Sequence, residues 1–121
     1  MLCVGAVLEL DRFLFKHVGL YIGQGFVLQN HFERGEEVVP YNSFHGGSAV
    51  KLRSGAVDNP QTVLQRVQTI LASPARYDLL RNNCEHTAYR ALDGNPRSPQ
   101  LALYGLVIVV GGLLVATARA Q

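Results

Sequence analysis

The feature that most constrains this chain is a run of 18 uncharged, mostly apolar residues, LALYGLVIVVGGLLVATA, at positions 101–118. A helix of this length approaches the ~30 Å thickness of a bilayer's hydrocarbon core. The run is apolar on all sides, which predicts a single-pass transmembrane helix and not a core helix with one buried stripe. Only three residues follow it, so we expect a C-terminal anchor with the rest of the chain on the cytosolic side. Gly112 and Ala116 form a small pair four residues apart, which favours self-association through this helix.

The remaining residues are enough for one compact domain, which we place at 1–93. Residues 94–100 are predicted to be a linker, because Gly94 can end a helix and Pro96 and Pro99 prevent its continuation. Short alternating or β-branched runs precede two helical patterns, which predicts an α+β domain with a small antiparallel sheet and two helices. The predicted strands are 6–10, 17–23, 26–30, 37–41 and 48–53; one helix begins at Pro60 with Asn59 as its cap, and the other runs from Cys84 to about Leu92.

Composition excludes several classes of function. The net charge is only +2, and no block of lysine and arginine is present to follow a nucleic-acid backbone. The two cysteines, Cys3 and Cys84, are too few for a disulfide framework, and we expect reduced thiols. No cysteine and histidine cluster has the spacing of zinc ligands, so neither a metal nor an organic cofactor is implied.

Cys84 is the candidate nucleophile. Asn82 and Asn83 precede it and are good helix N-caps, so Cys84 is expected in the first turn of a helix. Unpaired backbone N–H groups and the helix dipole at that position favour the thiolate and predict a lowered cysteine pKa. The alternative is a buried structural cysteine. Cys3 lies in an apolar segment with no such setting, and we interpret it as a packing residue.

A thiol nucleophile needs a base, and the chain has four histidines. His86 is two residues beyond Cys84, about 200° around the helix, and is interpreted as structural. His45 is expected in a surface loop, and His31 follows the second strand of the predicted hairpin. His17 opens a strand on the face of Gly19 and Tyr21, which makes it a candidate to line a cleft. On its own, a histidine at a strand start is more often structural.

Two segments together resemble the lecithin:retinol acyltransferase-like family. They are KHVGLYIGQGFVLQN, with His17, Tyr21 and Gly23, and LRNNCEHTAYRAL, with the tetrapeptide NCEH at 83–86. The resemblance covers roughly residues 5–93. It implies a thiol enzyme of the circularly permuted papain-like, NlpC-type fold that transfers or hydrolyses acyl groups, usually of phospholipids. Several members carry a C-terminal membrane helix, as this sequence is predicted to do.

The resemblance also implies roles for single residues. Cys84 would attack an ester carbonyl to form a thioester, with His17 as base, and backbone N–H groups and Tyr21 would meet the oxyanion. Lipid-acting members place a second histidine where this chain has Gln29, whose carbonyl can orient an imidazole without supplying charge. Asn30 has the wrong strand parity for this role. His31 has the right parity but lies about 7 Å further along, so it could serve only across a bulge.

Three functions follow as hypotheses. The first is a membrane-anchored cysteine acyltransferase or phospholipase-type hydrolase. The second is an amidase or peptidase with the same pair of residues, which a wide polar cleft would favour. The third is a non-catalytic domain that binds lipid or a protein partner, which a dispensable Cys84 would favour.

Overall fold

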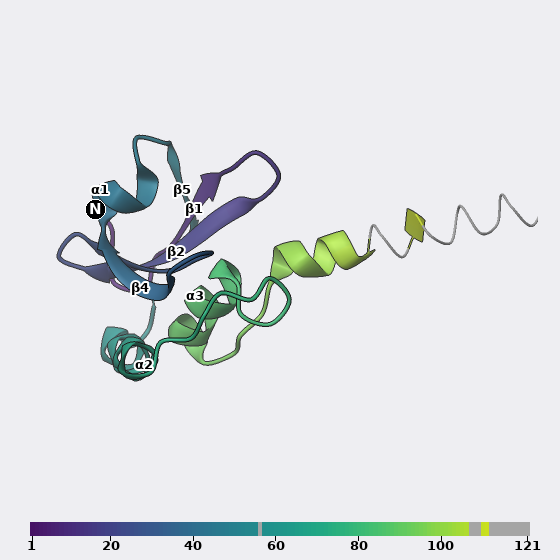
Figure 1. Cartoon of the computed structure of the whole chain (residues 1–121). Coiled ribbons are helices and arrows are strands. Elements are labelled where there is room, and N and C mark those ends of the chain that lie inside the picture. The colour runs from purple at the N-terminus through teal and green to yellow at the C-terminus, as the bar shows by residue number, and fades with distance from the viewer. Residues whose placement is uncertain (56, 107–109, 112–121) are drawn as a thin grey trace, which may run out of the picture.

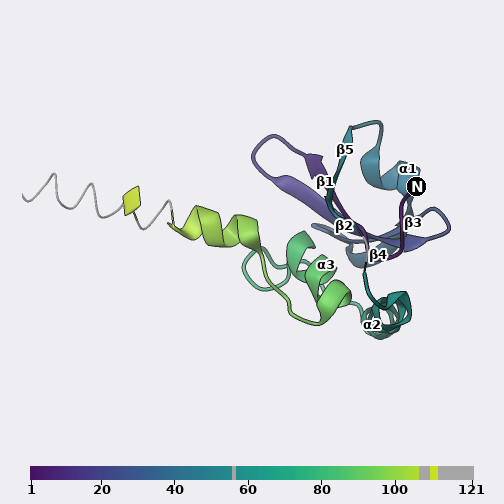
Figure 2. The ribbon, with the colours of Figure 1, turned by 180° about the vertical axis from the view of Figure 1, so that it is seen from behind.

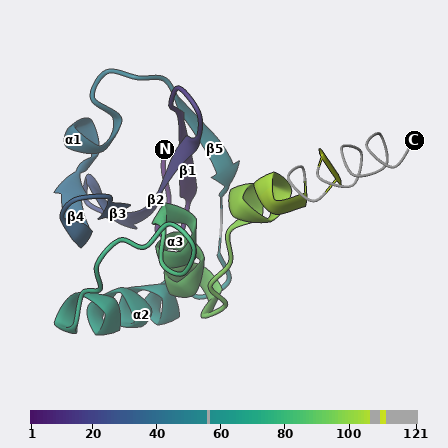
Figure 3. The same cartoon turned by 45° about the vertical axis from the view of Figure 1, so that its right-hand side comes forward.

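The computed structural model describes residues 1–55, 57–106 and 110–111, and it centres on a five-stranded antiparallel sheet of order β4-β3-β2-β1-β5 (Figure 1). Helices α2 and α3 lie against one face of the sheet, and the short helix α1 lies near the other (Figure 3). This confirms the predicted α+β class. The elements are β1 (Val7–Asp11), β2 (Lys16–Gly23), β3 (Phe26–His31), β4 (Gly35–Pro40), α1 (Tyr41–His45), β5 (Val50–Ser54), α2 (Pro60–Ala72) and α3 (Cys84–Asp93).

Strands β1 to β4 divide their apolar side chains between two clusters, because successive residues point to opposite faces. Toward α2 and α3, β2 contributes Val18 and Leu20 to a buried cluster. The other face is covered by Phe44 of α1, which packs with Leu8, Leu10 and Val27. The predicted turn between β2 and β3 is confirmed: Gln24 and Gly25 have φ of 54° and 82°, the positive values that a two-residue hairpin turn requires.

Helix α1 is the element that the sequence did not predict. Strand β4 includes residues 37–40 of the strand expected at 37–41, but Tyr41 was also expected in that strand and His45 in a loop. Instead Tyr41 begins α1, because Pro40 before it has no N–H to continue the strand ladder. The turn of helix brings Phe44 onto Gly19, where a Cβ would lie 2.6 Å from the Phe44 ring. Only glycine at position 19 allows this approach.

The two predicted helices are confirmed. Asn59 caps α2 by accepting hydrogen bonds from the backbone of Gln61 and Thr62, and Pro60 occupies its first turn. The side chains of Val63, Val67 and Ile70 are buried against the sheet and α3. Helix α3 then lies between α2 and β2, which places its first residue against the start of β2.

The segment after α3 is attached to the domain. Glu85, which is fully buried, accepts hydrogen bonds from the Ser98 hydroxyl at 2.7 Å and from the Gln100 backbone at 3.0 Å. A helix begins at residue 99 and leads away on the side of the β1–β2 loop (Figures 1 and 2). Among the residues that the structure describes, no helix has the length and apolar character needed to cross a membrane. The membrane helix predicted at 101–118 falls largely on residues 107–109 and 112–118, which lie outside the described residues.

Candidate active site

The N-terminus of α3 is fixed by a reciprocal cap. The Asn83 side chain accepts hydrogen bonds from the backbone N–H groups of Glu85 and His86, at 2.9 and 3.2 Å. In return, the Asn83 N–H donates to Nδ1 of His86 at 3.0 Å. His86 is therefore a capping residue, which agrees with the structural role expected for it, and its ring nitrogen Nδ1 is engaged by the Asn83 N–H. Asn30 of β3 holds the preceding turn by donating to the carbonyl of Asn82 at 2.7 Å.

Cys84 occupies the first position of α3 and is only 5% exposed. Its Sγ lies 3.8 Å from the carbonyl oxygen of Lys16, the residue before His17. The sulfur therefore contacts the backbone at the start of β2. The predicted lowering of the Cys84 pKa is wrong. Burial raises the pKa of this thiol, and the backbone N–H groups of Val18 and Glu85 offset that effect only in part.

His17 is hydrogen-bonded to Gln29 across the β2–β3 pair, with 2.9 Å between Nε2 and Oε1. The other end of the amide settles the assignment, because Nε2 of Gln29 donates to the carboxylate of Glu37 at 3.2 Å. A carboxylate only accepts, so Gln29 must present its oxygen to His17, and His17 must carry its proton on Nε2. Nδ1 of His17 is thus the basic nitrogen. Burial also lowers the pKa of His17, which keeps the imidazole neutral.

Glu37 is itself held by Arg34. The guanidinium Nε lies 2.6 Å from Oε1 of Glu37, and the Arg34 side chain makes two further hydrogen bonds to Oε2. These hydrogen bonds lower the pKa of Glu37, so the carboxylate stays charged behind Gln29. The result is a linear series of contacts, Arg34 to Glu37 to Gln29 to His17, in which only Arg34 and Glu37 carry charge.

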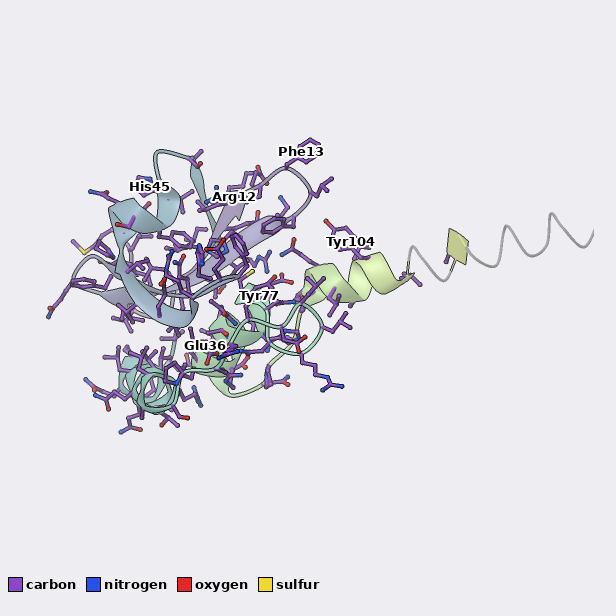
Figure 4. All side chains as sticks on the ribbon, in the orientation of Figure 1. Arg12, Phe13, Glu36, His45, Tyr77 and Tyr104 are labelled. Atoms are coloured by element: carbon purple, nitrogen blue, oxygen red, sulfur yellow. The ribbon has the colours of Figure 1, made fainter. Side chains whose placement is uncertain are left out.

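Cys84, His17 and Gln29 border one cavity of about 690 Å³. Its volume is that of a pocket for a small molecule or part of a lipid. Phe44 closes the cavity beside His17, with 5.4 Å between the two ring centroids. Three further residues that line it are labelled in Figure 4: Arg12 at the β1–β2 loop, Tyr77 before α3 and Tyr104 on the C-terminal helix. Within the described part of the chain, no three histidine, cysteine or acidic side chains come close enough to bind a metal ion.

Two predicted site residues take other positions. The Tyr21 hydroxyl accepts a hydrogen bond from the Gly25 N–H at 3.0 Å, within the β2–β3 hairpin, and Tyr21 does not line the cavity. His31 lines the cavity, but its Nδ1 accepts from the backbone of Glu33 and Arg34 at 3.1 and 3.3 Å. The structure thus brings Gln29, and not His31, to His17.

Sequence reasoning missed two residues at this site. Tyr77 lies in the irregular segment before α3, and its pKa is raised by burial and by the negative charge of a Cys84 thiolate. Gln100 holds the start of β2, because its side chain accepts from the Lys16 N–H at 2.6 Å and donates to the Lys16 carbonyl at 2.8 Å. Neither residue stands in a pattern with a helical or strand period, so only the folded chain identifies them.

The chain matches a known protein family over most of its length. The family model described as lecithin retinol acyltransferase matches residues 2–97, which include every strand and all of α1, α2 and α3. No curated protein matches the chain.

Proposed function

Because the chain belongs to the lecithin retinol acyltransferase family, we propose that it is a membrane-anchored thiol acyltransferase or acyl hydrolase that acts on phospholipid esters. Cys84 is the nucleophile and His17 the base. The observation that carries the proposal is the oriented imidazole. Gln29 and Glu37 hold the proton of His17 on Nε2, so Nδ1 is free to accept a proton in the cavity where Cys84 lies.

In the proposed first half-reaction, both groups begin neutral, because burial raises the pKa of Cys84 and lowers that of His17. Nδ1 of His17 takes the thiol proton as Sγ attacks the ester carbonyl. The tetrahedral intermediate then collapses to a thioester, and the departing alcohol, a lysophospholipid, takes the proton back from His17. Gln29 accepts the Nε2–H throughout and stabilises the imidazolium that forms between these steps.

In the second half-reaction, His17 removes a proton from water or from an alcohol or amine acceptor, which attacks the thioester. The sulfur leaves as a thiolate and recovers that proton from His17. Water yields a free fatty acid and another acceptor yields the transfer product. Hydrolysis and transfer therefore use the same residues of the site.

The oxyanion needs donors that the protein does not already use. Asn83 engages the N–H groups of Glu85 and His86, and the N–H of Thr87 donates to the Asn83 carbonyl. The N–H of Cys84 has no such partner among the described residues, and we assign it to the oxyanion. Tyr77 is the second donor, because its raised pKa keeps the hydroxyl protonated and it borders the same cavity.

The lining of the cavity favours an acyl ester over a peptide. Its side chains include Leu14, Phe15, Phe32 and Leu79, and its apolar surface can accept a hydrocarbon chain. The uncharged sequence at 101–118 supports anchorage by a single C-terminal helix with the enzyme on the cytosolic side. An anchored enzyme meets its lipid substrate at a high effective concentration. Pairing of such helices through Gly112 and Ala116 remains a further prediction.

The test is intact-protein mass spectrometry of the full chain in detergent with mixed phospholipids. We expect an adduct of fatty-acyl mass that is present in the wild type and in Cys3→Ala and absent in Cys84→Ala. Hydroxylamine should remove it, because it cleaves thioesters. Absence of an adduct while an amide substrate is cleaved would support the peptidase alternative. An inert Cys84 toward both substrates would favour the non-catalytic domain.

A further inference from the structure

Large apolar side chains from four separate segments surround the opening of the cavity. They are Phe13, Leu14 and Phe15 of the β1–β2 loop, Phe32 of the β3–β4 turn, Leu79 before α3, and Tyr104 of the C-terminal helix, and we call them the apolar rim. All of them except Phe13 also line the cavity. Phe13 is 96% exposed and stands at the tip of its loop (Figure 4).

Hydrogen bonds fix two of the segments that form the rim. The Tyr104 hydroxyl donates a hydrogen bond of 2.6 Å to the Leu14 carbonyl, which ties the C-terminal helix to the β1–β2 loop. The same loop is closed at its base by a hydrogen bond of 2.8 Å from the Arg12 N–H to the Phe15 carbonyl. The loop and the helix therefore present their apolar side chains in a fixed relation to the opening.

This composition is unusual for a hairpin loop. Such loops are rich in glycine, asparagine and other polar residues, because they face water. Here three consecutive large apolar residues are exposed, with exposed fractions of 96% for Phe13, 73% for Leu14 and 49% for Phe15. Exposed apolar area costs about 25 cal/mol per Å² relative to burial, so the rim gains free energy from an apolar partner.

The charge around the opening indicates which partner fits. The cavity lining contains the basic residues Arg12, Lys16 and Arg34 and no aspartate or glutamate. Lys16 and Arg34 are paired with acidic neighbours outside the lining. Arg12 makes only a 3.4 Å side-chain contact to Ser48 among the described residues, so its charge is available. Apolar side chains beside an uncompensated cation match a bilayer surface, with acyl chains beneath anionic phosphates.

We propose that the apolar rim inserts into the lipid bilayer while Arg12 meets its phosphate groups, so that the cavity opens directly into the membrane. This inference rests on the proposed function and names the surface through which the acyl substrate enters. The rim is continuous with the helix that begins at residue 99, whose sequence stays uncharged to Ala118. That helix would hold the rim at the depth where ester groups lie.

The absence of tryptophan from the sequence makes a direct test possible. Phe13→Trp places a single fluorophore on the rim. Phe26→Trp is the matched control, because Phe26 is an exposed aromatic after the far end of β2, eight residues or about 26 Å from the rim. The full chain is reconstituted into vesicles of phosphatidylcholine with a minor share of phosphatidylglycerol, with and without bromine on the acyl chains.

We expect Phe13→Trp to emit at shorter wavelength than Phe26→Trp in the same vesicles and to lose most of its fluorescence in brominated vesicles. Phe26→Trp should keep its fluorescence in brominated vesicles. Equal quenching at both positions, or none at either in protein that floats with the vesicles, would overturn the proposal. So would a blue shift of Phe13→Trp that depends on protein concentration without lipid, because it would assign the rim to a second copy of the chain.

This readout does not depend on turnover. Cys84→Ala in the Phe13→Trp background should leave quenching unchanged. Quenching without an acyl adduct would thus reject the proposed chemistry and retain the membrane surface. An adduct without quenching would reject the surface alone.

Discussion

Gln29 and Glu37 lie directly opposite each other in the β3–β4 ladder, and their side chains are hydrogen-bonded at 3.2 Å. This contact determines which end of the Gln29 amide faces His17. Gln29 is uncharged, but in this fixed orientation it can position the His17 imidazole as a second histidine or a carboxylate would. Glu37 acts through Gln29 and is a positioning residue.

Replacing Glu37 by glutamine should release that orientation. An amide at position 37 can accept or donate, so Gln29 can turn its Nε2 toward His17 and favour a proton on Nδ1 instead. We expect activity to fall by about tenfold, below the 10²–10⁴ range of full acid–base catalysis. The decisive measurement is the ¹⁵N shift of the His17 ring nitrogens, which should move from one tautomer to a mixture. Glu33→Gln, in the adjoining turn, is the control, and an unchanged tautomer in Glu37→Gln would contradict the assignment.

Substitutions of Gln29 itself should separate orientation from charge. In Gln29→His, one ring nitrogen can accept from His17 while the other donates to Glu37, so activity should be kept or raised. In Gln29→Ala, the imidazole loses its partner and activity should fall by about 10²-fold. The comparison of kcat on a phospholipid substrate tests both variants. A large loss in Gln29→His would mean that Gln29 touches substrate.

The two thiols should differ in reactivity in the order opposite to that expected from the helix N-terminus. Cys3 is exposed, whereas Cys84 is buried and its pKa is raised. At neutral pH we expect iodoacetamide to label Cys3 first. Labelling of Cys84 should increase as the pH rises past 9.0, the ordinary value for this group, because the thiolate then forms. Peptide mass spectrometry identifies each site, and preferential labelling of Cys84 at neutral pH would contradict the effect of burial.

The pH below which activity declines should be lower than it would be for a histidine with an ordinary pKa. His17 acts as a base only when it is neutral, and burial lowers its pKa from 6.5. Activity should therefore hold as the pH falls through 6.5 and decline only near the lowered pKa. As the pH falls, His17 takes up a proton near pH 6.5 in the unfolded chain but only at a lower pH in the folded chain. The free energy of unfolding therefore decreases as the pH falls below 6.5. Titration of the His17 ring signals by NMR should give the same midpoint as the activity.

Arg53 should be important for stability because it neutralises a buried acid. It contacts Glu85, which is fully buried, and also pairs with Glu9. Arg53→Ala would leave the Glu85 carboxylate without a cation, at a cost of about 3–5 kcal/mol. Lys51→Ala on the same strand removes only an exposed pair with Asp11 and should cost less than about 1 kcal/mol. Urea unfolding at neutral pH measures both, and equal losses would contradict this role.

The sequence predicted elements whose signals are local. The strands followed from alternation, and the two longer helices followed from Asn59, Pro60 and Asn83 at their starts. Position 29 followed from the family resemblance, which places a second histidine at the end of the hairpin, by counting from His17. The predicted lowering of the Cys84 pKa was wrong because β2 and the cavity walls bury the thiol. No local sequence pattern describes that burial. Glu37 could be found only from the β3–β4 register, and α1 only from the contact of Phe44 with Gly19.

The double hydrogen bond between Gln100 and the backbone of Lys16 has a practical consequence. The residue before His17 is held by a residue beyond the family match at 2–97 and inside the stretch expected to be a linker. A shortened protein that stops at 93 or 97 would keep every strand and all three labelled helices, and yet it would free the segment that carries the base. Soluble fragments for crystallography or screening should therefore extend past Gln100, or their low activity will be mistaken for a property of the enzyme.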